Sequence, residues 1–248
     1  MYQLLSQSTT HAPHDSCTSE TIATANTPSD YLQEAVFAGG SFWVLEAAFG
    51  RVDGVVGTAT GYCGGTLRKP TQREVSQGRT GHTEVVKVVY DKRELSYKSL
   101  CNVFWHSHDP TNRDYLRFGL DTHLRSAIFY ADEEMRKRAQ ESKVEHQMKL
   151  NRRIVTKMIP HDPDLFFLAE NQHQKYYLQR DCIWLCDSLN LRSTEQFVNS
   201  QLSCKLNGIL GGDASMIAGR LRVMMEGCDL SRQPKLILEE IIAKLERQ

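Results

Sequence analysis

The stretch Ala38-Gly39-Gly40-Ser41-Phe42-Trp43 marks a change from strand to helix, and the rest of the chain can be placed around it. The apolar segment 35–38 favours a short strand, and the two glycines allow a tight turn. Ser41 falls at the N-cap of the following helix, where a side-chain oxygen is available to backbone N–H groups. A small residue beside two aromatic side chains at a positive helix end suits polar chemistry on an apolar group. An ordinary strand-to-helix turn explains the same pattern.

The segments after this stretch predict an α+β fold. On the strand that we expect at 84–90, Val85 and Val89 share one face, while Glu84 lies on the other face. The predicted series is strand 35–38, helix 42–52, strand 54–62, strand 84–90, helix 96–105, strand 126–130, helix 131–150 and strand 154–159. The order β-α-β-β-α-β is that of a ferredoxin-like two-layer sandwich with a split βαβ core. We expect helices on one face of its sheet, with a further helix and strand appended.

Three parts of the chain are predicted. Residues 1–34 are rich in Ser and Thr and contain no Lys or Arg, which favours a disordered tail. Residues 35–180 form the α+β domain, and 181–248 form a helical extension. Within the extension the expected features are a capping box at Ser193 and Gln196, caps at Asp213 and Ser231, an apolar stripe at Leu238, Ile241, Ile242 and Leu245, and a Glu240–Lys244 pair.

Composition indicates a soluble globular protein. The 248 residues are 40% hydrophobic, and 30 basic and 30 acidic residues leave a formal net charge of zero. This balance favours neither nucleic acid nor a membrane as partner, and the N-terminus has no pattern of a signal peptide, so we expect a cytoplasmic protein. Seven cysteines at irregular spacing are expected to be reduced. Cys182 and Cys186 lack a second pair at metal-ligand spacing, so no metal is expected.

Several motifs resemble the peptide methionine sulfoxide reductase A family, in the family's order, from about residue 35 to residue 179. They are Gly39-Gly40-Ser41-Phe42-Trp43, Gly61-Tyr62-Cys63-Gly64-Gly65, Pro70-Thr71-Gln72-Arg73-Glu74-Val75, Gly81-His82-Thr83-Glu84, Val103-Phe104-Trp105 with His108-Asp109-Pro110, Arg125-Ser126-Ala127-Ile128 and Ala169-Glu170-Asn171-Gln172-His173-Gln174. The resemblance does not cover the tail or the C-terminal helices.

The resemblance implies a site for methionine-S-sulfoxide in peptides or proteins. In such a family a thiolate attacks the sulfoxide sulfur, a carboxylic acid protonates the oxygen, and thioredoxin or another external thiol is the reductant, without a bound cofactor. Phe42 and Trp43 would hold the substrate methyl group, and Glu84 would donate the proton. Burial of Glu84 among valines would raise its pKa. Asp121 and Gln72 occupy further substrate-binding positions; a loop cap explains Asp121 equally well.

Three positions depart from the family pattern. Ser41 stands where the family has its nucleophilic cysteine, and Gln72 and Leu124 stand where it has tyrosines. A serine hydroxyl is a far weaker nucleophile than a thiolate at neutral pH, and it cannot enter a sulfenic acid and disulfide cycle. Each departure therefore removes one part of the family's mechanism.

Another cysteine could supply the thiol. Cys63 lies in a glycine-rich segment that could border the same cleft, which makes it a possible redox cysteine; a small residue filling a loop position explains it as well. Three further cysteines, Cys182, Cys186 and Cys204, lie where the family often has resolving cysteines. With serine at position 41, a resolving cysteine has no partner.

The sequence supports two main functional hypotheses, an enzyme and a binding protein. The first is a peptide-methionine (S)-S-oxide reductase with Ser41 and Glu84 at the catalytic positions. The alternative is a catalytically inactive pseudoenzyme that binds methionine sulfoxide or protein partners. A third possibility is that the C-terminal helices are an interaction module on a scaffold domain. The sequence leaves the oligomeric state open.

Overall fold

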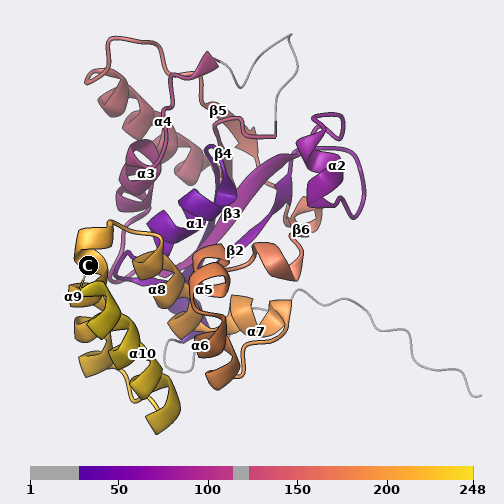
Figure 1. The fold of residues 1–248 in the computed structure, drawn as a ribbon. Helices are drawn as coiled ribbons and strands as arrows, with labels where there is room; N and C mark the ends of the chain where they lie inside the picture. The colour runs from indigo at the N-terminus through magenta and orange to yellow at the C-terminus, as the bar shows by residue number, and fades with distance from the viewer. Residues whose placement is uncertain (1–27, 114–122, 248) are drawn as a thin grey trace, which may run out of the picture.

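A computed structural model describes residues 28–113 and 123–247. Its centre is a mixed sheet of six strands in the order β5-β4-β1-β3-β2-β6 (Figure 1). The strands are β1 Leu32–Ala38, β2 Val55–Cys63, β3 Thr83–Asp91, β4 Ala127–Tyr130, β5 Lys157–Pro160 and β6 Phe167–Leu168.

The inner strands confirm the predicted fold class. β1 pairs antiparallel with β3 and β4, and β2 pairs antiparallel with β3, which gives the order β4-β1-β3-β2 of a split βαβ sandwich. β5 extends this sheet parallel to β4, as expected for an appended helix and strand. The two-residue strand β6 on β2 was not predicted.

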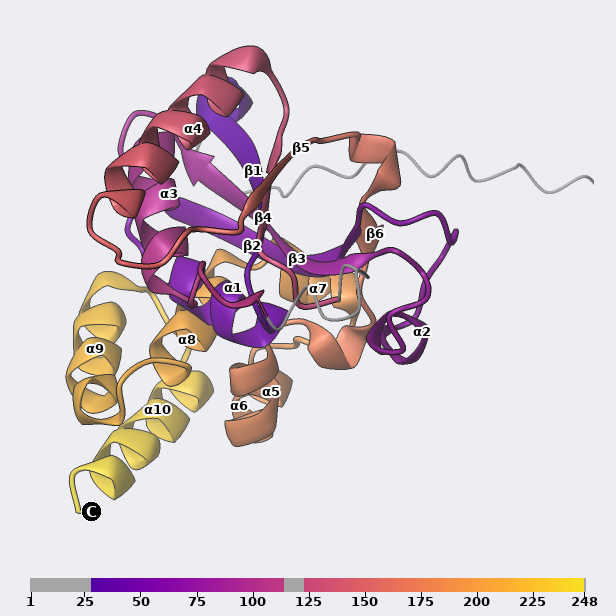
Figure 2. The same ribbon diagram turned by 90° about the horizontal axis from the view of Figure 1, so that it is seen from above.

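Helices surround the sheet (Figures 1 and 2). They are α1 Phe42–Gly50, α2 Gln72–Ser76, α3 Tyr97–His106, α4 Glu133–Gln147, α5 Tyr176–Asp181, α6 Ile183–Ser188, α7 Thr194–Asn199, α8 Gln201–Leu210, α9 Ala214–Gly227 and α10 Arg232–Leu245, with short 3-10 turns at η1 Ser29–Tyr31, η3 Pro163–Leu165 and η4 Asn171–His173. In both views α9 and α10 lie at the opposite end of the molecule from α4 and β5.

The alternation on β3 sorts its side chains as predicted. Val86 and Val88 join the main core with apolar side chains of α1, α3 and α4, whereas Val85 and Val89 lie in smaller clusters on the other face. That other face is also buried, because Val198 of α7 and neighbouring apolar side chains pack on it. The expectation that helices cover only one face was therefore incomplete.

The predicted boundary of the tail was wrong by several residues. Residues 29–31 form η1 and residues 32–34 begin β1, where Gln33 pairs with Tyr90. Gln33 also accepts a hydrogen bond of 2.7 Å from the Tyr90 hydroxyl, so cross-strand contacts hold a segment whose composition suggested disorder. Residues 1–27 lie outside the described part of the chain.

The C-terminal helices begin with the caps that the sequence predicted. Ser193 and Gln196 form a capping box, and Asp213 caps α9 through the N–H of Ser215, while Ser231 is at the N-cap of α10 without a side-chain bond. The Glu240–Lys244 pair forms at 2.9 Å. The boundary at residue 180 stays a prediction, although Cys204 of α8 belongs to the main core cluster.

Candidate active site

Glu84 lies on β3, on the face of the sheet that meets α1. It pairs with Tyr62 of β2 and is only 4% exposed. Its Oε2 atom accepts the backbone N–H of Phe42 at 3.0 Å. Burial raises the pKa of Glu84 to about 7, although hydrogen bonds from the Phe42 N–H and the Gln72 side chain act in the opposite direction. A substantial fraction of this carboxyl group is therefore protonated at neutral pH.

Ser41 occupies the N-cap of α1, as predicted, but its hydroxyl makes no capping hydrogen bond. The Glu84 carboxylate accepts a first-turn N–H of this helix instead. The preceding Gly40 has a φ of 70°, a conformation that favours glycine, and its N–H donates to the Leu124 carbonyl at 3.2 Å. Leu124, three residues before β4, is thus held directly beside Ser41.

Aromatic rings gather next to Glu84 and Ser41. Phe42 is buried, with its ring centroid 5.9 Å from that of Tyr62 and 5.7 Å from that of His173. Trp43 is half-buried and stacks on Tyr176 at 4.2 Å, with 14° between the planes. The structure therefore brings the two predicted methyl-binding residues together with Glu84 and adds an aromatic wall from the segment 173–176.

Gln72 begins α2 and connects two parts of the site. Its side chain acts to lower the pKa of Glu84, and its backbone N–H donates to Oε1 of Glu170 at 2.9 Å. The other oxygen of Glu170 accepts from the Tyr62 hydroxyl at 2.8 Å. Burial acts to raise the pKa of Glu170, but these hydrogen bonds outweigh it and lower the pKa. Glu170 is therefore an ionised acceptor that joins the Tyr62 hydroxyl to the backbone of Gln72.

Sequence reasoning missed the roles of Tyr62, Glu170, His173 and Tyr176. The first three belong to motifs that carried the family resemblance, which was the available signal. The ring of His173 lies beside Phe42 and Trp43, and burial lowers its pKa.

Cys63 lies on the opposite face of the sheet from Glu84. It follows Tyr62 on β2, and successive side chains of a strand point to opposite faces. Its thiol packs in a cluster with Ala38, Val85 and Phe129, and burial raises its pKa to about 12. A redox role for Cys63 stays a prediction, but neither its direction nor its protonation supports attack on a substrate held by Glu84.

The remaining predicted residues divide into two groups. Asp121 lies outside the described residues. Of the six cysteines in the described ranges, Cys228 is exposed and the other five are buried. Burial raises the pKa values of all five, which are Cys63, Cys101, Cys182, Cys186 and Cys204. Each of these thiols is therefore protonated at neutral pH and a poor nucleophile.

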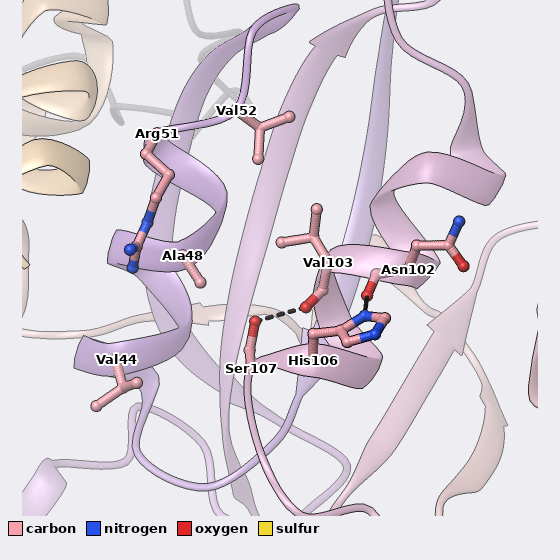
Figure 3. Close-up of a pocket in the computed structure, with 8 residues that line it drawn as sticks. All are labelled: Val44, Ala48, Arg51, Val52, Asn102, Val103, His106 and Ser107. Carbon is pink, nitrogen blue, oxygen red and sulfur yellow. Dashed lines mark hydrogen bonds between the residues drawn. The ribbon is translucent and has the colours of Figure 1, made fainter. Parts of the chain in front are cut away.

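A groove of about 580 Å³ lies between α1 and α3 (Figure 3). None of its lining residues is a predicted site residue. Three of its polar side chains already bond to main-chain carbonyls: the Ser107 hydroxyl to Val103, the His106 Nδ1 atom to Asn102 and the Arg51 Nε atom to Ala47. The groove therefore lacks the convergent polar groups that surround Glu84.

Residues 28–113 and 123–247 offer neither a cluster of metal ligands nor a membrane-spanning helix. No cluster of three or more His, Cys, Asp or Glu side chains there could hold a metal ion. No helix in the same ranges is both long and apolar enough to cross a bilayer.

Comparison with known proteins gives this arrangement a family. Residues 33–206 match the family described as peptide methionine sulfoxide reductase. Peptide methionine sulfoxide reductase MsrA of Methanoculleus marisnigri is 43% identical over 155 residues, which are 62% of this chain and 93% of that protein. Peptide methionine sulfoxide reductase A4 of Arabidopsis thaliana, named as chloroplastic, is 43% identical over 149 residues, 60% of this chain and 57% of that protein.

Two solved structures have a similar fold. Methionine sulfoxide reductase A of Corynebacterium diphtheriae is 30% identical with a TM-score of 0.52, covering 63% of this chain and 77% of that chain. The reduced form of Mxr1 from Saccharomyces cerevisiae is 25% identical with a TM-score of 0.56, covering 65% of this chain and 93% of that chain. The family match runs from β1 into α8 and includes Ser41, Phe42, Trp43, Gln72 and Glu84. The chain belongs to the peptide methionine sulfoxide reductase family.

Proposed function

We propose that the chain reduces methionine-S-sulfoxide in peptides and proteins to methionine, with thioredoxin or another external thiol as reductant. The observation that carries this proposal is the buried Glu84 carboxyl, whose pKa of about 7 makes it a proton donor at neutral pH beside the aromatic rings of Phe42 and Trp43. The alternative of an inactive binder gains no support from the relatives, which are named as reductases.

The substrate methyl group would lie against Phe42 and Trp43. This position brings the sulfoxide oxygen within reach of Glu84, and a proton from the carboxyl turns that oxygen into a better leaving group. The backbone N–H of Phe42 donates to Glu84 and keeps the carboxyl oriented, and the Gln72 side chain acts to lower its pKa. The methyl pocket thus selects the substrate while Glu84 activates it.

The thiol is supplied from outside this arrangement. Ser41 forms no sulfenic acid, so a thiol of the reductant bonds to the sulfoxide sulfur while the oxygen leaves as water. A second thiol then attacks the first thiol sulfur, which releases methionine and leaves a disulfide. One sulfoxide and two thiols give one sulfide, one disulfide and one water.

The test is the consumption of separated S and R epimers of a methionine sulfoxide peptide, with dithiothreitol or a thioredoxin system, followed by chromatography. We expect loss of the S epimer alone, and Glu84→Gln should abolish it. Absence of S-epimer loss with the wild-type chain, or equal loss with Glu84→Gln, would overturn the proposal. The cytoplasm stays a prediction for the location of the protein.

A further inference from the structure

A buried ion pair lies beneath the aromatic wall of the site. The Lys175 ammonium is 2.7 Å from Oε1 of Glu46, and both side chains are 0% exposed. Lys175 donates in addition to the Thr58 carbonyl at 2.7 Å, and its backbone N–H donates to Oε2 of Glu46 at 2.9 Å. Removing two charges from water is costly unless further hydrogen bonds satisfy them, and here they do.

The pair joins the two segments that carry the rings. Glu46 follows Phe42 and Trp43 by about one turn of α1, so it lies on the same helix as the methyl-binding residues. Lys175 sits between His173 and Tyr176 in the chain. The rings that these segments present meet across the wall at 5.7 Å for Trp43 and His173, and at 4.2 Å for Trp43 and Tyr176.

The backbone at Lys175 depends on this contact. Lys175 has a φ of 49°, a left-handed conformation that is uncommon for a residue with a side chain, and it immediately precedes α5. In that conformation both its main-chain N–H and its ammonium reach Glu46. The bend that turns the chain from η4 into α5 is therefore fixed by the carboxylate of α1.

A third residue extends the network into the C-terminal helices. Asn207 of α8 donates through Nδ2 to Oε2 of Glu46 at 3.4 Å. Its Oδ1 atom accepts the backbone N–H groups of Tyr177 and Leu178 at 3.0 Å and 3.3 Å. A single amide on α8 thus contacts both of the segments that the ion pair joins.

We infer that Glu46, Lys175 and Asn207 are positioning residues that set the separation of Phe42 and Trp43 from His173 and Tyr176. None of the three is proposed to touch the substrate. The C-terminal helix α8 is then a supporting element of the site, rather than only an appended module. The consequence for substrate affinity rests on the proposed function, whereas the consequence for ring geometry does not.

A merely structural role makes a different prediction. If the network contributed only to stability, weakening it would lower the free energy of unfolding. The Trp43–Tyr176 stack and the substrate affinity of the folded protein would stay unchanged. If the three residues position the rings, weakening the network changes both the Trp43–Tyr176 stack and the substrate affinity, because small displacements of binding groups change affinity strongly. The comparison needs a control that costs stability outside the network, and Leu238→Ala provides it, because Leu238 is buried on α10, which packs on α6 and α9.

The experiment uses the full chain with the exposed Trp184 replaced by phenylalanine, so that a difference against Trp43→Phe isolates the emission of Trp43. Titration with N-acetyl-methionine-S-sulfoxide amide measures affinity in the same samples. Asn207→Ala and Glu46→Gln should shift the Trp43 emission to longer wavelength and weaken affinity about tenfold. Leu238→Ala should change neither.

The inference is overturned if folded Asn207→Ala and Glu46→Gln proteins keep the wild-type emission and affinity, or if Leu238→Ala shifts them equally. Lys175→Met is a third variant. If it does not fold, Asn207→Ala and Glu46→Gln decide whether the network positions the rings. If the wild-type chain binds no sulfoxide, the proposed function fails, while the emission of Trp43 still tests the positioning role.

Discussion

The backbone N–H of Phe42 donates to the Glu84 carboxylate at 3.0 Å, which joins the first residue of α1 to the beginning of the inner strand β3. The proposed proton donor thereby takes the place of a helix cap, while the hydroxyl of Ser41 makes no capping bond. The positive end of α1 favours the ionised carboxylate, and burial favours the neutral acid. Burial is the larger effect, because the pKa is raised to about 7.

The raised pKa makes stability depend on pH. Because the folded protein binds the Glu84 proton more tightly than the unfolded chain, this contribution is fully present below about pH 4.5 and is lost as the pH rises to about 7. Glu84→Gln removes the ionisation. We expect the variant to gain about 3 kcal/mol relative to wild type between pH 4 and pH 8. Urea unfolding at both pH values measures this; a constant difference would contradict it.

Gln72 tunes the same carboxyl group. Its side-chain hydrogen bond lowers the pKa of Glu84 against the effect of burial. Gln72→Leu should therefore raise that pKa further, by about one unit for the loss of one hydrogen bond. Carbon-13 NMR of labelled glutamate follows the titration directly. Gln77→Leu, at the exposed end of α2, is the matched control and should leave the titration unchanged.

Ser41→Cys tests whether the rest of the site is intact. A thiol at the N-cap of α1 would be ionised more readily than an ordinary cysteine, because the helix end favours a thiolate. With dithiothreitol as reductant, turnover of methionine-S-sulfoxide should rise more than about a hundredfold over wild type, since a resident nucleophile replaces an external one.

Ser41→Ala is the control for that change and should behave like wild type. If Ser41→Cys gains nothing, the departures at Gln72 and Leu124 have altered the site beyond what one thiol can restore. If Ser41→Cys alone turns over, the pocket is intact and the natural chain lacks only its nucleophile.

Much of the fold could be predicted because its signals are local. The alternation on β3 and the caps at Ser193 and Asp213 each depend on residues a few positions apart. The glycine-rich turn before Phe42 also located the junction at the centre of the site. α2 and β6 were missed because segments of five and two residues carry no period of their own and form only against the rest of the protein.

The support of the site could not be predicted in this way. Glu46 and Lys175 are separated by 129 positions, and only the packing of α5 beneath α1 shows that they pair. The side on which Cys63 lies depends on the register of β2 against β3, which fixes Tyr62 opposite Glu84. A one-residue shift in that register would have placed the thiol on the face of the site.

The crossing of α1 and α8 gives a last prediction about how the C-terminal helices attach. A methyl group on Gly50 would lie 2.5 Å from the Cys204 carbonyl, and one on Gly208 would meet the backbone of Gly50 and Arg51. Backbone atoms cannot move aside cheaply, so Gly50→Ala and Gly208→Ala should each cost about 1–3 kcal/mol. Gly219 of α9 has nothing within 4 Å, so Gly219→Ala should stabilise by up to about 1 kcal/mol. Thermal and urea unfolding of the three variants compare them directly, and a neutral Gly208→Ala would show that α8 does not pack closely on α1.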